Sequence, residues 1–128
     1  MKYHSVIIQW GILLSMATGL WSAEPEKPSS KQFLGILRLE ETFYPEAAWT
    51  KEANDAVRRH FVRLQESAKS RKVIFAGRTM EVNEKTMGLI VFEAADLREA
   101  EEFVASDPAV VAGVMKAEVR PYQIAVAR

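Results

Sequence analysis

Short apolar runs recur along the chain after residue 32, and each is bounded by polar or turn-forming residues. Runs of this length that are rich in valine, isoleucine, leucine and phenylalanine favour β-strands over helices. The last run contains Pro121, which should break or end its strand. The pattern therefore predicts four strands, at residues 33–39, 72–78 and 87–93 and within 114–126.

Between these runs, apolar residues recur at three-to-four spacing, which is typical of amphipathic helices. The first such segment should begin at Pro45, which suits the first turn of a helix, and should end near Ser70. A second helix should follow Asp96, whose carboxylate is a good N-cap. A short third helical turn should open at Asp107 and end at Gly113.

The resulting order is β-α-β-β-α-β, which predicts an α+β fold of the ferredoxin-like type. In that fold, a four-stranded antiparallel sheet carries its helices on one face. The strands are apolar on both faces, and helices that cover only one face leave surplus apolar residues on the other. We expect a homodimer packed through the open sheet faces, a dimeric α+β barrel. The surplus residues include Ile36, Ile74, Ile90 and Ile124.

The N-terminus has the pattern of an export signal. Lys2 precedes the apolar run Val6–Trp21, which is close to the length of a signal-peptide core and short for a bilayer span. Cleavage after Ala23 would give a signal peptide at residues 1–23, and cleavage after Gly19 is a competing choice. We expect a secreted or periplasmic protein with no membrane span after cleavage. An uncleaved single-pass anchor is the alternative.

Residues 24–31, EPEKPSSK, are rich in proline, serine and charge, so they predict a linker to a domain at residues 32–128. Lysine and arginine number 17, as do aspartate and glutamate, so the chain lacks the basic field of a nucleic-acid-binding protein. Cysteine is absent and only two histidines are present, which argues against a disulfide or a zinc site. No glycine-rich phosphate loop is seen, so we expect neither a metal nor a cofactor.

His60 is the strongest candidate for chemistry, because it is the one histidine outside the leader and lies on the apolar stripe of the first helix. Two roles are open for it: a core residue satisfied by a carbonyl, or a general base that faces a ligand. Asp107 is a possible carboxylate partner, although an aspartate before proline at a helix start is often only a cap. Asp55 is a poor partner, since it lies on another side of the helix.

Two arginines are candidates for binding an anionic substrate. Arg78 ends the second strand beside Gly77, and Arg38 projects from the first strand. For each, an ordinary solvated side chain is the more common interpretation of an arginine in such a position. A cleft near them could take a small aromatic ligand, because several aromatic residues are available to line it. These are Trp49, Phe61, Phe75 and Phe92.

Three short motifs resemble the YciI-like, or YCII-related, domain family. They are H-F-V-R-L-Q followed by V-I-F-A-G-R, then S-D-P with V-A-G-V, then V-R-P-Y. The resemblance covers about Phe33 to Tyr122. The resemblance implies a dimeric ferredoxin-like barrel and a site that includes His60. The family's site aspartate falls at Lys69 or Ser70 in this chain, and the glycine of its turn falls at Arg71.

Two functions are compatible with these features. The first is an exported domain that binds a small molecule in a cleft near His60 without catalysis. The second is a cofactor-free lyase or isomerase, similar to the dehydrochlorinases that the resemblance suggests, in which His60 is the general base and Asp107 its partner. The sequence specifies neither the ligand nor the reaction.

Overall fold

The computed structural model of the protein describes residues 30–128. The predicted signal peptide, and all but the end of the predicted linker, lie outside these residues. Four strands form one antiparallel sheet in the order β2-β3-β1-β4. The strands are β1 (Lys31–Leu39), β2 (Val73–Arg78), β3 (Gly88–Ala94) and β4 (Met115–Tyr122). This is the ferredoxin-like α+β fold that the sequence predicts.

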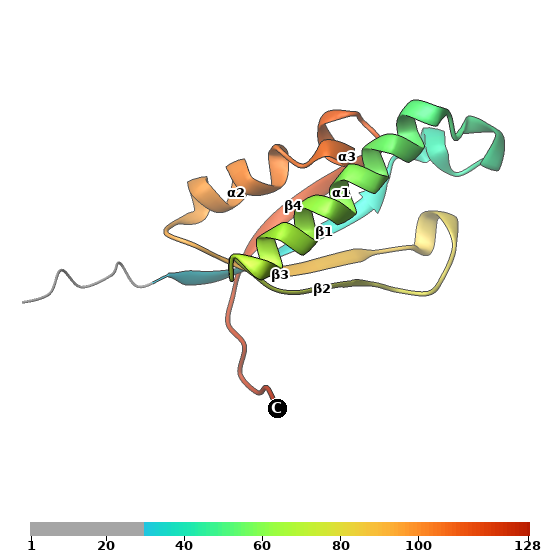
Figure 1. Ribbon diagram of the computed structural model, residues 1–128. Coiled ribbons are helices and arrows are strands. Elements are labelled where there is room, and N and C mark those ends of the chain that lie inside the picture. Colours follow the sequence, from blue (N-terminus) through green and yellow to red (C-terminus); the bar gives the residue numbers. More distant parts are fainter. Residues whose placement is uncertain (1–29) are drawn as a thin grey trace, which may run out of the picture.

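Three α-helices cover one face of the sheet, and the segment after β4 leaves on the opposite side (Figure 1). The helices are α1 (Lys51–Lys69), α2 (Leu97–Ala105) and α3 (Pro108–Val111). Helix α1 contacts β2 and α3, whereas α2 lies against β4, β3 and β1. Among the described residues, no helix is both long enough and apolar enough to cross a membrane.

The first helix begins later than the sequence pattern predicts. Pro45 has an extended backbone with ψ of 135° and precedes a 3-10 turn, η2 (Glu46–Ala48), which follows another, η1 (Glu41–Phe43). Helix α1 instead starts after Thr50, whose side chain accepts a hydrogen bond from the Ala53 backbone N–H. The prediction of a helix start at Pro45 was therefore wrong, because a hydroxyl cap further along the chain satisfies the helix end.

Asp96 and Asp107 are both N-caps, as predicted. The Asp96 carboxylate accepts from the Glu99 N–H, and the Asp107 carboxylate accepts from the Ala109 N–H. Each cap satisfies a backbone donor that would otherwise be unpaired at the start of its helix. The Asp107 cap matters most for the site, because it fixes the position of a buried carboxylate.

The core lies between the sheet and the helices. One cluster under α2 is centred on Phe33, Ile90 and Phe92, and a second under the first turns of α1 includes Ala53 and Ala56. Ile90 is only 3% exposed, so the expectation that it lies on the open sheet face was wrong. It points toward the helices because it is in phase with Phe92 along β3.

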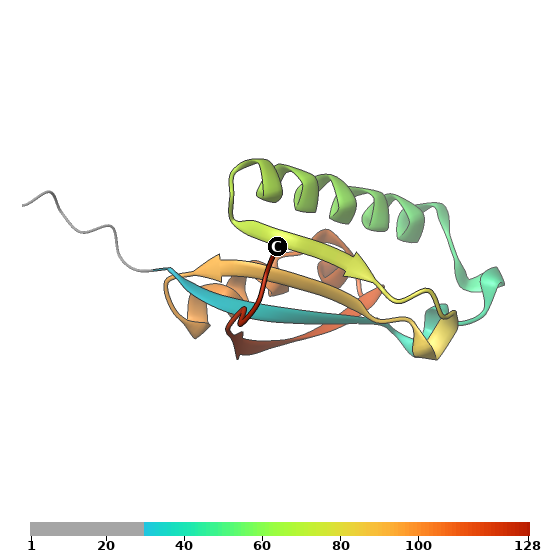
Figure 2. The same cartoon turned by 90° about the horizontal axis from the view of Figure 1, so that it is seen from below.

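The opposite sheet face has no covering element among residues 30–128, and the sheet is viewed from that side in Figure 2. Strand alternation places Leu34 and Ile36 of β1 beside Val91 and Leu89 of β3 on this face. Phe75 of β2 pairs with Val91 and is 50% exposed. We call Leu34, Ile36, Phe75 and Leu89 the open face; Val91 lies among them but is only 1% exposed. The open face is apolar at its centre, as the sequence predicts.

Two helices end in the same hydrogen-bonding motif but with different residues. At the end of α3, the Gly113 N–H donates to the Val110 carbonyl, and the next N–H reaches back to Ala109. At the end of α1, the Arg71 N–H donates to Ala68, and the next N–H reaches Ser67. Both are Schellman motifs, which need a left-handed residue. Gly113 has φ of 71°, and Arg71 has φ of 66°.

We therefore predict that Arg71→Gly stabilises the domain. A residue with a Cβ is strained in the left-handed region, whereas glycine is not, so the free energy of unfolding should rise by about 0.5–1 kcal/mol. Urea unfolding followed by circular dichroism measures this change. Arg71→Ala is the matched control and should give no such gain, because alanine keeps the Cβ. Equal stability of the two variants would contradict the assignment of strain to Arg71.

Candidate functional site

His60 lies at the middle of the buried stripe of α1. The stripe consists of Ala53, Ala56, His60 and Leu64, spaced so that all four face the protein interior. His60 is 6% exposed, and its Nδ1 lies 2.8 Å from Oδ2 of Asp107. The histidine is therefore satisfied by a carboxylate from another part of the chain, not by a backbone carbonyl.

Asp107 is 1% exposed, and its two oxygens have different partners. Oδ1 accepts from the Ala109 N–H at 2.9 Å, while Oδ2 faces His60. Asp107 thus caps α3 and pairs with His60 at the same time, so the two roles left open by the sequence do not exclude each other. Asp55, the weaker candidate, instead pairs with Lys51 and Arg58 on the outside of α1.

Arg63, one turn after His60, completes the surroundings of this carboxylate. Its Nη1 is 3.5 Å from Asp107 Oδ2, and its Nη2 donates to the Phe103 carbonyl at 2.7 Å and to the Ser106 hydroxyl at 2.9 Å. The guanidinium also lies over the Phe103 ring, 4.3 Å from its centre. Arg63 was not singled out from the sequence, so this role was missed. The signal was its spacing of three residues from His60.

These contacts set the charge of Asp107. Burial alone raises the pKa of the Asp107 carboxyl, but the hydrogen bond and charge of His60, the Ala109 N–H and the Arg63 charge outweigh burial and lower it. Asp107 is therefore ionised at neutral pH and can only accept hydrogen bonds. It follows that the proton of a neutral His60 ring sits on Nδ1, and Nε2 carries the free lone pair.

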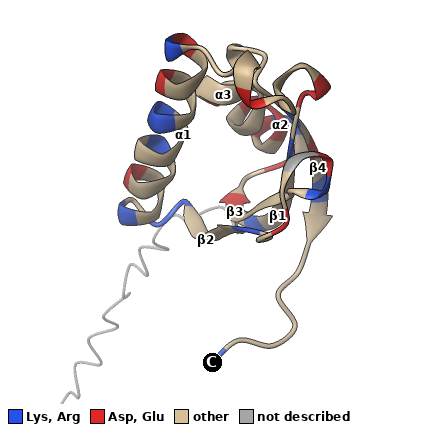
Figure 3. Ribbon diagram, turned by 90° about the vertical axis from the view of Figure 1, so that its right-hand side faces the viewer, with Lys and Arg blue, Asp and Glu red and all other residues tan. Residues whose placement is uncertain are grey.

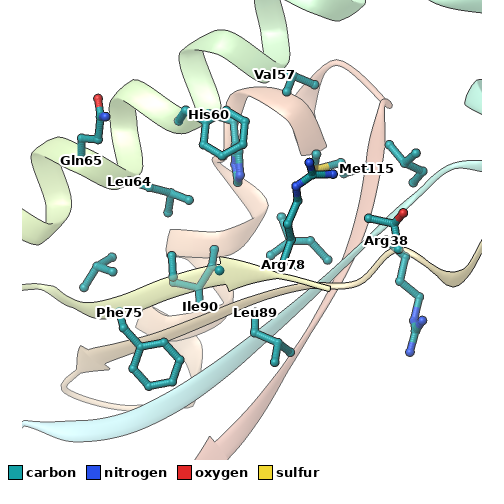
Figure 4. Close-up of a pocket in the computed structure, with 18 of the residues that line it drawn as sticks. Arg38, Val57, His60, Leu64, Gln65, Phe75, Arg78, Leu89, Ile90 and Met115 are labelled. Carbon is teal, nitrogen blue, oxygen red and sulfur yellow. The ribbon is translucent and has the colours of Figure 1, made fainter. Parts of the chain in front are cut away.

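A cavity of about 730 Å³ lies beside His60, between α1 and the sheet (Figure 4). No protein group of residues 30–128 hydrogen bonds to Nε2 of His60. In the same residues, every side-chain nitrogen or oxygen that is fully enclosed has a hydrogen-bond partner, so Nε2 is not fully enclosed. Nε2 therefore remains accessible, and the space it meets is this cavity. Its volume is in the range of small-molecule sites.

The cavity walls are mainly apolar and come from several elements. The Trp49 indole N–H donates to the Phe43 carbonyl at 2.9 Å, and the two rings meet edge to face at one end of the cavity. Of the four aromatic residues expected from the sequence, Trp49 and Phe61 contribute to the lining, and Phe92 is fully buried in the core. Phe75 borders the cavity, but its side chain points away from α1 toward the open face (Figure 4). Further apolar walls come from Leu37, Leu39, Val57, Leu64, Val73, Val82, Ile90 and Met115.

The two candidate arginines lie differently. Arg78 extends from the end of β2 toward α1, on the side of the sheet where His60 lies (Figure 4). Arg38 also borders the cavity, but its side chain points away from α1, and its Nη2 lies 3.4 Å from the Met87 sulfur. The structure thus brings Arg78 to the same space as His60 and directs Arg38 elsewhere.

At the positions where the resemblance places the family's aspartate, this chain has no carboxylate. Lys69 and Ser70 are exposed at the end of α1, and Lys69 pairs with Glu66 at 3.0 Å. Lysine and arginine positions recur along the outer side of α1 (Figure 3).

In residues 30–128 no group of three or more histidine, aspartate or glutamate side chains is placed to hold a metal ion.

We predict that Asp107→Asn lowers the free energy of unfolding by about 2 kcal/mol at pH 7, because a buried hydrogen bond to a charged group is lost. Asparagine keeps an oxygen for the helix cap, so the substitution removes the charge without removing the cap. The folded-state pKa of Asp107 is below its ordinary 3.8, so its contribution is present above pH 3.8 and disappears as pH falls through the lowered value.

Urea unfolding of both proteins between pH 3 and pH 7 should therefore show a difference in stability that shrinks in acid. Asp55→Asn is the control, and it should change stability little at any pH because Asp55 pairs only at the helix surface. A penalty for Asp107→Asn that is the same at both ends of the pH range would contradict the assignment of an ionised, paired Asp107.

Comparison with known proteins agrees with the motifs and the fold. The family model described as the YCII-related domain matches residues 38–123, most of the part that the structure describes. No curated protein matches the chain at a significant level. The matched range includes His60, Arg78 and Asp107, the three α-helices and strands β2, β3 and β4, but only the last two residues of β1. The chain therefore belongs to the YCII-related domain family.

Proposed function

We propose that this domain binds a small molecule in the cavity beside α1 and catalyses proton transfer on it without a cofactor, using His60 as general base. The observation that carries the proposal is the 2.8 Å contact between His60 Nδ1 and the buried Asp107 carboxylate. A carboxylate in this position fixes the ring tautomer and stabilises the imidazolium that forms when the ring accepts a proton.

The chemistry follows from the two ring nitrogens. Nδ1–H is held by Asp107, so the lone pair of Nε2 is free to remove a proton from a ligand atom in the cavity. Return of this proton to a different atom would complete an isomerisation, and departure of a leaving group after its removal would complete an elimination. The apolar walls favour either step, because charge interactions are stronger where water is scarce.

Ligand binding without chemistry is the second candidate function. It is favoured by the exposed Lys69 and Ser70, which leave the family's usual acidic position without a carboxylate. Asp107 supplies a carboxylate from another element, and this argues for the catalytic proposal. Both functions use the same cavity, so the experiment must detect proton transfer itself.

The test is solvent deuterium incorporation. The protein is incubated in D₂O with a panel of aromatic and lactone compounds, and exchange into each compound is followed by mass spectrometry. We expect at least one compound to exchange, and His60→Gln to slow this exchange by about 10²-fold or more. Arg59→Gln is the matched control, since Arg59 is the exposed neighbour of His60 on α1 and should leave the rate unchanged.

A second readout needs no substrate. In ¹⁵N NMR spectra of the neutral His60 ring, we expect the proton on Nδ1 in the unmodified protein. Asp107→Asn should shift protonation toward Nε2, because an amide N–H can donate to Nδ1. An Nε2-protonated ring in the unmodified protein would overturn the general-base proposal, and so would exchange that is unaffected by His60→Gln.

We also propose that the domain is an exported homodimer. Export rests on the apolar run Val6–Trp21 behind Lys2. Dimerisation rests on the open face, where Ile36 and its apolar neighbours have no covering element among residues 30–128. A second sheet packed face to face would remove this surface from water.

We predict that light scattering gives a mass twice that of one chain at micromolar concentration. Ile36→Asp should convert the protein to a monomer, because a charge at the centre of an apolar interface is left without a partner. Val111→Asp is the matched control, since Val111 is 72% exposed on α3, away from the open face, and should leave the mass unchanged. A monomeric unmodified protein would refute the proposed dimer.

A further inference from the structure

The polar groups of the cavity are few and unevenly distributed. His60 lies on α1, and Arg78 lies across the space at the end of β2. Most of the remaining wall is aliphatic or aromatic. A ligand that fills this space must therefore have an apolar body, and any charged group that it carries must lie near a polar residue.

Arg78 is the charged group best placed to receive such a ligand. Its side chain extends into the space between β2 and α1 (Figure 4), and it forms no ion pair with any of residues 30–128. Its guanidinium carries a permanent charge and a planar fork of N–H donors that matches a carboxylate. By contrast, Arg63 is fully engaged by Asp107, Phe103 and Ser106.

The nearby acidic groups do not compete strongly for Arg78. Asp107 is enclosed and already has His60, the Ala109 N–H and Arg63 as partners. Glu81 borders the cavity and is charged at neutral pH, because hydrogen bonds from the Thr79 hydroxyl and its own backbone N–H lower the pKa of its carboxyl. It is exposed to solvent, however, and this weakens its attraction for Arg78. Neither carboxylate forms an ion pair with Arg78 in the described part of the chain.

We infer that the ligand is an amphipathic monocarboxylate, with an apolar body of about one or two rings in the cavity and its carboxylate on Arg78. This inference rests on the proposed function only in taking the cavity as the ligand site. A carboxylate on Arg78 leaves the apolar body between β2 and α1, beside His60 Nε2. The reacting hydrogen would then lie on the body of the ligand, not on its charged group.

The experiment compares two probes of similar shape, 1-naphthoate and the uncharged 1-naphthalenemethanol, by isothermal titration calorimetry at pH 7 with the full chain. We expect 1-naphthoate to bind about tenfold more tightly, the usual worth of a partly exposed hydrogen bond to a charged group. Arg78→Met should abolish this preference while leaving 1-naphthalenemethanol binding unchanged, because methionine keeps an apolar stem of similar length.

Arg38→Met is the matched control. It removes the same charge from the edge of the same cavity, but the Arg38 side chain points away from α1, so the preference should persist. A preference that survives Arg78→Met, or is lost equally in both variants, would overturn the assignment of Arg78. Failure of both probes to bind the unmodified protein would overturn the ligand class.

These results are separable from the test of His60. His60→Gln should retain the preference for 1-naphthoate, since Arg78 is unchanged, while losing deuterium exchange. If the preference is absent but His60-dependent exchange is seen, the ligand class is wrong and the general-base proposal stands. If the preference depends on Arg78 but no compound exchanges, the cavity binds carboxylates without the proposed chemistry.

Discussion

The contact between His60 and Asp107 is the constraint on which the site depends. An ionised carboxylate that is 1% exposed is costly unless its oxygens are paired. Here the pairing joins α1 to the short α3, across 47 residues of sequence. Moving α1 away from α3 would break this contact and leave a buried charge unsatisfied. The orientation of the imidazole is therefore fixed by the same interaction that holds the two helices together.

The cavity exists because the two parts of the core fill different regions. One cluster packs α2 onto the middle of the sheet, and the other packs the small residues Ala53 and Ala56 of α1 close to Val114. Further along α1, His60 and Leu64 face the space above β2 and β3, which no helix side chain fills completely. His60, held by Asp107, therefore lies at the border between the packed core and the open cavity, where an imidazole can be both fixed and accessible.

Much of the fold could be predicted from the sequence, because strand runs, helical spacing and the caps Asp96 and Asp107 are local signals. The start of α1 could not, since two 3-10 turns precede Thr50 and break the simple pattern. Asp107 could be proposed as the partner of His60, but a cap and a site residue look the same in sequence. Arg63 was missed because its partners, Phe103 and Ser106, are brought to it only by tertiary packing.

The double use of Asp107 also explains how the site can differ from the usual pattern of the family. The end of α1 carries Lys69 and Ser70 in exposed positions, so a carboxylate there would lie in solvent. The cap of α3, by contrast, must have a side-chain oxygen regardless of function, because the Ala109 N–H needs an acceptor. A carboxylate fills that need with one oxygen and has a second oxygen left for His60. A serine or threonine cap would satisfy the helix equally well but would offer no charge to the imidazole. The charge at this cap, more than the cap itself, is what connects Asp107 to the proposed chemistry of His60.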